Sequence, residues 1–273
     1  MKTYSFLPFF LVLLLAACGS SSDGKIDAGP DASIDAGSDA GEDAGLDAGE
    51  DAGLDAGADA GGDSITEVPL EGWGTITGQC GELDDDEWTS TSPFDFTNHI
   101  DFGTVGFVYE DLSPGGQTIF DDDNLGGSSI HSEIIAYETL YRCELAELLK
   151  TERFIEYLDV NGKKTDILVR IDERKVGVSV VRAFHYPPTE PYPLEDAVTK
   201  LRQKLSEVLL SAANADPADA WERSMLHVVA YNDQSADAFA VALDQLEADE
   251  PEVVDETIVL ITVTDGEDAF AYE

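Results

Sequence analysis

Two neighbouring strands, predicted at 166–172 and 175–182, carry an acidic and a hydroxyl side chain that could take part in catalysis. β-branched residues alternate with smaller or polar ones in both runs, and Glu173-Arg174 is expected to form the turn between them. Asp166 opens the first strand, and Ser179 lies in the second half of the other. A carboxylate at the start of a strand can hold a divalent cation that activates water. The pattern therefore indicates metal chemistry as the first hypothesis to test.

A second acidic cluster precedes this hairpin. Asp122, Asn124, Gly127 and Glu133 match positions one, three, six and twelve of an EF-hand calcium loop. Position five is Gly126, which has no oxygen in its side chain, and no helix is predicted before the loop. A full EF-hand is therefore not expected. The alternative is an irregular calcium site, whose candidate ligands are Asp121, Asp122, Asp123 and Glu133.

Helices and strands alternate around the hairpin. The predicted segments are helices at 128–150, 194–213 and 236–248 and further strands at 153–160, 224–231 and 257–264. Asn161-Gly162 is a hairpin signal because both residues tolerate positive φ. The order is helix, three strands, helix, strand, helix, strand. This alternation predicts one α/β domain with a mixed sheet over residues 128–273.

This order resembles the αβββαβ core of the restriction-endonuclease-like superfamily, the PD-(D/E)XK nucleases, over about residues 128–231. The last helix and strand would be additions to that core. The resemblance implies a site in which Glu133 on the first helix and Asp166 hold a divalent cation such as Mg²⁺. The family's third strand carries an acid followed two residues later by a lysine. In this chain those two positions are Ser179 and Val181.

Ser179 and Val181 depart from the family pattern, because serine is a weak neutral ligand and valine has no charge. In some members the lysine lies on the following helix, where Lys200 and Lys204 would share one face. The alternative is that both lysines are solvated surface residues. The catalytic residues implied by the resemblance are Glu133, Asp166, Ser179, Lys200 and Lys204, and this degenerate set favours an inactive domain.

The region between 64 and 127 shows no sustained periodicity. We expect an irregular extension that packs on the core, with short strands near 72–78 and 102–109. Cys80 in this region and Cys143 in the first helix could form a disulfide if the domain is exported. Two buried free thiols are the alternative.

The amino terminus has the layout of a secretory signal, with Lys2 ahead of an apolar run too short to span a bilayer. Its end, Leu15-Ala16-Ala17-Cys18, resembles the lipobox of bacterial lipoproteins. This resemblance implies removal of a signal peptide, lipidation of Cys18 and attachment to a membrane. Gly19 implies the outer membrane. The alternative is an ordinary secretory peptide with an incidental cysteine.

Residues 19–63 contain an aspartate at nearly every fourth position, usually followed by Ala-Gly. The segment has no apolar face and repels itself, so we expect a disordered tether. A calcium-binding β-roll is the alternative, but its repeats need a regular large apolar residue. Here the fourth position varies.

The chain has a formal charge of −42, and residues 64–273 contain 44 of its 57 acidic and 13 of its 15 basic side chains. Lys and Arg contacts with phosphates supply most non-specific affinity for nucleic acids, so this composition disfavours such a partner. Two functional hypotheses follow. One is an outer-membrane or surface-tethered lipoprotein whose endonuclease-like domain is inactive and serves a binding or structural role. The other is a metal-dependent phosphodiesterase or nuclease that uses Glu133 and Asp166.

Overall fold

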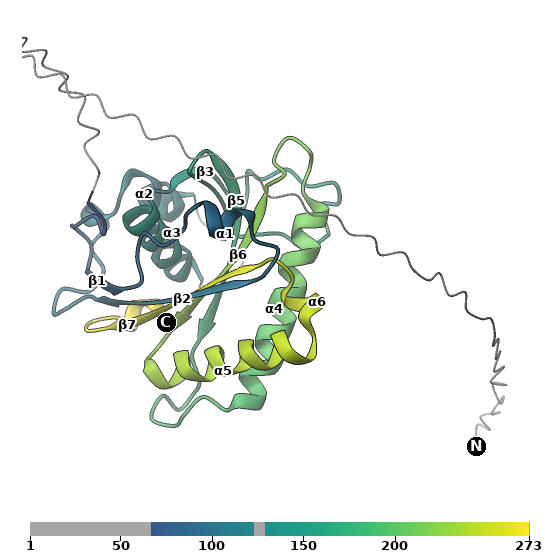
Figure 1. The fold of residues 1–273 in the computed structure, drawn as a ribbon. Helices are drawn as coiled ribbons and strands as arrows, with labels where there is room; N and C mark the ends of the chain where they lie inside the picture. The colour runs from purple at the N-terminus through teal and green to yellow at the C-terminus, as the bar shows by residue number, and fades with distance from the viewer. Residues whose placement is uncertain (1–66, 123–128, 273) are drawn as a thin grey trace, which may run out of the picture. The chain divides into compact units, whose positions relative to one another are not determined.

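The computed structural model describes residues 67–122 and 129–272 (Figure 1). The signal peptide and lipid site predicted at 1–18, the tether predicted at 19–63 and the candidate calcium ligand Asp123 lie outside the described residues. No helix in the described part of the chain is long and apolar enough to cross a lipid bilayer.

Seven strands form one mixed sheet in the order β1-β2-β7-β6-β5-β4-β3. Their bounds are β1 Thr75–Gly78, β2 Phe94–Asp101, β3 Glu147–Thr151, β4 Ile167–Ile171, β5 Arg174–Ala183, β6 Arg223–Ala230 and β7 Ile258–Asp265. β3, β4 and β5 form an antiparallel meander, whereas β5, β6, β7 and β2 are parallel to one another. β1 closes the other edge, antiparallel to β2.

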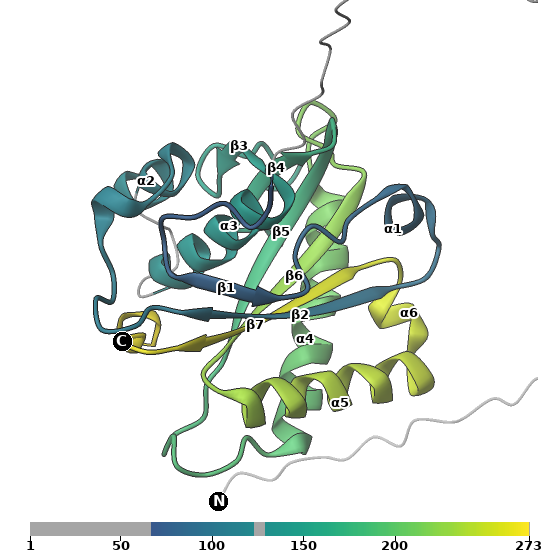
Figure 2. The ribbon, with the colours of Figure 1, turned by 60° about the vertical axis from the view of Figure 1, so that its left-hand side comes forward.

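Helices cover both faces of the sheet (Figure 2). Their bounds are α1 Asp85–Thr89, α2 Pro114–Asp121, α3 Ile130–Glu144, α4 Leu194–Asn214, α5 Asp233–Asp249 and α6 Pro251–Val254, with short 3₁₀ turns at Tyr109–Asp111 and Ala269–Ala271. Because side chains alternate along a strand, β5 supplies both cores. Val176, Val178 and Val180 pack in the cluster that contains α3, whereas Val181 and Ala183 pack against α4 and α5.

The predicted α/β class and mixed sheet are confirmed, and the order α3-β3-β4-β5-α4-β6 is the expected αβββαβ sequence of elements. The turn before β5 is displaced by one residue from its predicted place. Asp172 and Glu173 both have positive φ, at 47° and 64°, so the tight turn lies at these two residues.

The boundary between the first helix and the first strand of the meander was predicted wrongly. The helix ends at Glu144, and Leu145 adopts a left-handed conformation with φ of 54°. The segment 147–151 is the edge strand β3, and the segment 153–160 predicted as that strand contains no regular strand. Asn161-Gly162 accordingly closes no hairpin. Leu145, Leu148 and Leu149 have helical spacing, so periodicity alone cannot place the end of this helix.

The region predicted as an irregular extension supplies two strands of the sheet, and β1 falls within the strand predicted near 72–78. β2 lies between β1 and β7 and is the last strand of the parallel part of the sheet, whereas the strand predicted at 102–109 does not form. A buried polar chain joins the strands here: His227 Nε2 and Thr262 Oγ1 share a hydrogen bond at 2.7 Å, and the Thr262 hydroxyl donates to Asn98 Oδ1 at 2.7 Å. Burial lowers the pKa of His227 to about 3, so the imidazole is neutral.

A disulfide and a buried ion pair connect the early part of the domain to α3. Cys80 and Cys143 are bonded, with Cα atoms 4.7 Å apart, so the bridge forms and the free-thiol alternative does not apply. Directly before Cys143 in α3, the Arg142 guanidinium lies 3.1 Å from the carboxylate of Glu138, whose side chain is fully buried. Arg142 also donates to the carbonyls of Leu70, Glu71 and Asp111.

Candidate functional site

The end of the β3-β4-β5 meander places the predicted metal ligand beside another acid. Thr151 pairs with Ile167, and Ile167 pairs with Val178 across the three strands. Glu152, Asp166 and Ser179 each lie one residue beyond these paired positions. Glu152 was not among the sequence candidates, because it belonged to the turn before a strand that was placed wrongly.

Asp166 has a carboxylate that is already bonded within the fold. Its Oδ2 accepts the backbone N–H of Val180 at 2.6 Å, so the side chain replaces a strand partner at the end of β4. Burial and, to a smaller extent, the nearby Glu133 carboxylate raise the pKa of Asp166 to about 7. The Val180 amide and the charge of Lys204 act in the opposite direction. The proton on Asp166 therefore exchanges near neutral pH.

Glu133 and Asp166 are close enough to affect each other electrostatically, although they belong to different layers of the fold. Glu133 lies in the first turn of α3 and is buried, and the Ser129 hydroxyl donates to its Oε1 at 3.0 Å. Glu152 adds a further negative charge that raises the pKa of Asp166. The predicted pair is thus part of an acidic cluster made of Glu133, Glu152 and Asp166.

Ser179 and Val181 are held in the interior on the α4 side of β5. The Ser179 and Thr165 hydroxyls lie 3.1 Å apart and share a hydrogen bond, and both side chains are buried. Val181 packs among apolar residues of α4 and α5. The two positions at which the resemblance implies an acid and a lysine are therefore a neutral hydrogen-bonded pair and part of the apolar core.

The two lysines proposed as replacements have different surroundings. Lys200 Nζ donates to the carbonyl of Arg182 at 2.9 Å, and burial lowers the pKa of Lys200. Lys204 lies 3.7 Å from the Glu207 carboxylate, and its charge lowers the pKa of Asp166. Lys204 is therefore the one of the two that acts on the acidic cluster.

The donor set does not fit the metal site that the resemblance implies. Among the described residues, no three histidine, cysteine, aspartate or glutamate side chains gather closely enough to hold a metal ion. Of the calcium candidates, Asp121 accepts from the Tyr109 hydroxyl at 2.9 Å and Asp122 accepts from the Thr151 hydroxyl at 3.1 Å. These two carboxylates bond to separate elements and do not face a common centre.

Asp166 gives a test of this electrostatic environment. We expect Asp166→Asn to become more stable relative to the unmodified chain as the pH rises from 5 to 8, since asparagine keeps an oxygen for the Val180 amide and carries no charge. The folded pKa of about 7 exceeds the unfolded value of about 3.9, so the folded state binds more protons between these values and loses stability as the pH rises. Urea unfolding at each pH measures the difference in the free energy of unfolding between the variant and the unmodified chain.

Asp159→Asn is the matched control, because the Asp159 carboxylate also accepts a backbone amide, that of Asn161, but the residue is exposed. The same chemical change is thereby made without burial. If the free energy of unfolding changes with pH equally in Asp166→Asn and in the unmodified chain, the electrostatic coupling assigned to Asp166 is contradicted.

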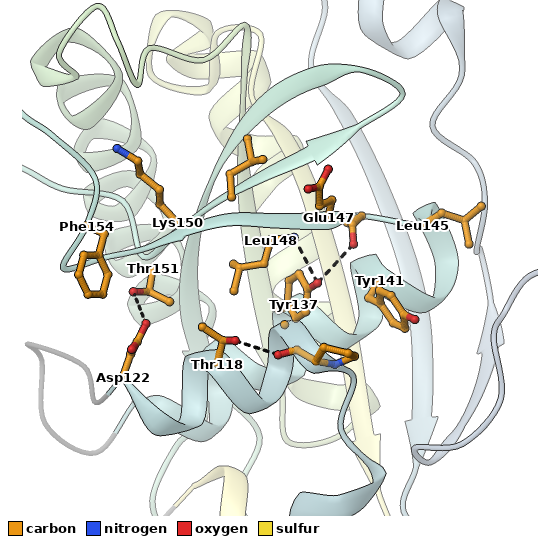
Figure 3. A pocket seen from close by; sticks show the side chains of 14 residues that line it. Thr118, Asp122, Tyr137, Tyr141, Leu145, Glu147, Leu148, Lys150, Thr151 and Phe154 are labelled. Atoms are coloured by element: carbon orange, nitrogen blue, oxygen red, sulfur yellow. Dashed lines mark hydrogen bonds between the residues drawn. The ribbon is translucent and has the colours of Figure 1, made fainter.

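A groove of about 670 Å³ lies along β3, between this edge strand and helices α2 and α3 (Figure 3). Leu145 and Phe154 are at its two ends, and Tyr137, Tyr141 and Leu148 line its middle. The Tyr137 hydroxyl donates to the carbonyl of Ala146 and accepts from the N–H of Leu148. Sequence reasoning missed this groove because the segment that forms it was predicted as the end of a helix.

Comparisons with known proteins give no functional assignment. No family model matches this chain. The AAC-rich mRNA clone AAC4 protein of Dictyostelium discoideum is 38% identical over 123 residues, which are 43% of this chain and 18% of that protein. The chain thus spans less than a fifth of that relative. The structure of Pyrococcus furiosus SfsA in complex with Ca²⁺ has a TM-score of 0.26 and 13% identity, covering 50% of this chain and 56% of that one.

Proposed function

We propose that this chain is a lipid-anchored protein of the bacterial outer membrane or cell surface, whose α/β domain binds a partner and does not cleave nucleic acid. One observation carries the non-catalytic part of the proposal. The positions of the missing acid and lysine, Ser179 and Val181, are occupied by side chains that are bonded or packed inside the fold. A substrate phosphate would meet neither a second ligand nor a cation at these positions.

A restriction-endonuclease-like ancestry is part of the proposal. The antiparallel meander β3-β4-β5, followed across α4 by β6 parallel to β5, supports it. The position of Asp166 directly before β4 supports it as well, because an aspartate begins the corresponding strand in the family that the chain resembles. In this interpretation the domain has kept the order of helices and strands of the family and has lost the side chains needed for cleavage.

The charge of the domain supports a binding role with a partner other than nucleic acid. Residues 64–273 have a net charge of −31, which repels a phosphate backbone at long range. For the anchor, support comes from the order of apolar run, small residues and Cys18, and the Cys80–Cys143 disulfide is typical of an oxidising compartment. The acidic repeat at 19–63 would hold the domain away from the lipid surface.

The competing hypothesis is a divalent-metal-dependent phosphodiesterase that uses Glu133 and Asp166. The electrostatic coupling of these carboxylates and the charge of Lys204 beside them favour it. The donor set disfavours it, because the described residues supply no group of three acidic or imidazole ligands.

The test is a cleavage assay with the full chain, using linear DNA and RNA in the presence of Mg²⁺ or Mn²⁺. We expect no cleavage above the background of Asp166→Ala, because two charged groups of the family site are missing. Metal-dependent cleavage that is lost in Asp166→Ala would overturn the proposal in favour of the phosphodiesterase. For the anchor, we expect the expressed chain to fractionate with membranes and Cys18→Ser to be released into the soluble fraction.

A further inference from the structure

We infer that the groove along β3 is a docking site for an extended cationic segment of a partner protein with large apolar side chains. The inference rests on the proposed binding function and specifies the charge and the side chains of the partner segment. Its evidence is the shape of the groove, the side chains that line it and the charge around it.

The shape of the groove matches an extended chain. β3 is one of the two edge strands of the sheet and has five residues, which span about 16 Å at the usual rise per residue. The groove follows the strand from Leu145 to Phe154, as Figure 3 shows. A partner segment of about five residues in extended conformation would therefore fill it.

The lining of the groove supplies apolar contacts that the fold itself leaves exposed. Phe154 is 58% exposed and Leu145 is 47% exposed, and they flank the more enclosed Tyr137, Tyr141 and Leu148. Large apolar side chains at both ends of one groove are typical anchor sites for a partner. In an extended partner, alternate side chains point the same way, so two apolar residues of the segment could reach the groove together.

Backbone pairing contributes less here than in other strand-addition sites. The Tyr137 hydroxyl already bonds the carbonyl of Ala146 and the N–H of Leu148. The start of the β3 edge is thus covered from within the domain. We therefore assign specificity chiefly to the side-chain contacts made with Tyr141, Leu148 and Phe154.

The strongly negative charge of the domain favours a cationic occupant. Among the described residues that line the groove, Lys150 is the only basic side chain, and Asp219 neutralises it at 2.6 Å. Glu147 lies on the rim, where its side chain is 63% exposed and pairs with Arg170 at 2.6 Å. Asp122 lies at the side of α2, and its carboxylate has no basic partner among the ion pairs of the described residues. The net charge of −31 over residues 64–273 adds a long-range attraction for cations.

The experiment measures binding of three fluorescein-labelled peptides to the full chain by fluorescence anisotropy at 150 mM NaCl. The probe peptide is Gly-Lys-Leu-Lys-Phe-Lys-Leu-Gly. One comparison peptide has serine in place of Leu and Phe, and the other has glutamate in place of Lys. We expect the probe to bind at least about tenfold more tightly than either comparison peptide, because it alone has both the charge and the anchors.

Variants locate the binding on the molecule. Phe154→Ala is expected to weaken probe binding about tenfold, and Glu147→Gln to reduce both the affinity and its dependence on salt. Val241→Ala is the matched control, because Val241 is 50% exposed on α5, across the sheet from the groove. This control should bind the probe as the unmodified chain does. Phe154 and Glu147 are both exposed, so neither substitution threatens folding.

Four results would overturn the inference: no binding of the probe, equal binding of the serine peptide, unchanged binding by Phe154→Ala, or a dimer of the chain that Phe154→Ala dissociates in sedimentation. The last would assign the groove to a second copy. Each of these results leaves the cleavage and fractionation assays unaffected, so failure of this inference is distinguishable from failure of the proposed function.

Discussion

Replacing Arg142 by alanine is expected to lower the free energy of unfolding by about 3–5 kcal/mol, because the change leaves a buried charge without its partner. Arg142 and Glu138 lie four residues apart on α3, with both side chains removed from solvent. The Glu138 carboxylate also accepts the amide and hydroxyl of Ser113, at 2.8 and 2.7 Å. These two hydrogen bonds do not replace the positive charge that the variant lacks.

The Arg142→Ala variant loses hydrogen bonds as well as the ion pair. Arg142 donates to the carbonyls of Leu70, Glu71 and Asp111, so its guanidinium attaches the entry to β1 and the segment before α2 to the same helix. Burial raises the pKa of Glu138, and the Arg142 charge normally opposes this effect. Without Arg142 the folded state holds the Glu138 proton to higher pH. The deficit should therefore be larger at pH 8 than at pH 5.

Urea unfolding followed by circular dichroism measures this effect. Arg202→Ala is the matched control, since Arg202 also pairs with a glutamate, Glu250 at 2.7 Å, but on the surface. We expect Arg202→Ala to lower the free energy of unfolding far less than Arg142→Ala does, because exposed ion pairs contribute little to stability. Similar losses in the two variants would contradict the role given to burial.

Removing the disulfide is the second change with a large expected effect. Cys80 and Cys143 are separated by 63 residues, and closing a loop of this length restricts the unfolded chain by about 4 kcal/mol in entropic models. The double variant Cys80→Ser/Cys143→Ser should lose stability of this order. The bond also holds the segment before α1 against the end of α3, where the Glu144 carboxylate accepts the amides of Gly81, Glu82 and Leu83.

The unmodified chain treated with reductant should unfold at the same urea concentration as the double variant. Reductant should leave the free energy of unfolding of the double variant unchanged. This control shows that the reductant acts only through the disulfide. If the double variant keeps the stability of the oxidised chain, the bond is dispensable and the loop-closure argument fails.

Residue types alone predicted two of the three members of the acidic cluster. The resemblance named Asp166 and Glu133, and the structure brings both into one electrostatic environment. Their chemistry depends on neighbours that the motif does not name. Asp166 bonds the Val180 amide, and Glu152 lies beside it because of the strand register at Thr151 and Ile167. A one-residue change in that register would turn Glu152 to the opposite face.

Local patterns were sufficient for α4, α5 and the strands β5, β6 and β7. Each has a long apolar stripe or a nearly continuous apolar run, and the predicted bounds differ from the observed ones by at most a few residues. The departure of Ser179 and Val181 from the pattern that the resemblance implies was also readable, because it needs only residue identities on a well-placed strand. So was the strongly negative charge of the domain.

Tertiary contacts decided the rest. β2 joins the sheet beside β7 through contacts such as Asn98 with Thr262, 164 residues apart, and no local period encodes such a partner. β3 became a strand because α3 stops at Glu144 and Leu145 turns the chain, although its leucines have helical spacing. The choice between a bridge and two free thiols at Cys80 and Cys143 likewise depended on the distance between their backbones. Apolar and polar spacing specifies which face of a segment is buried, whereas the partner that buries it is specified only when the whole chain packs.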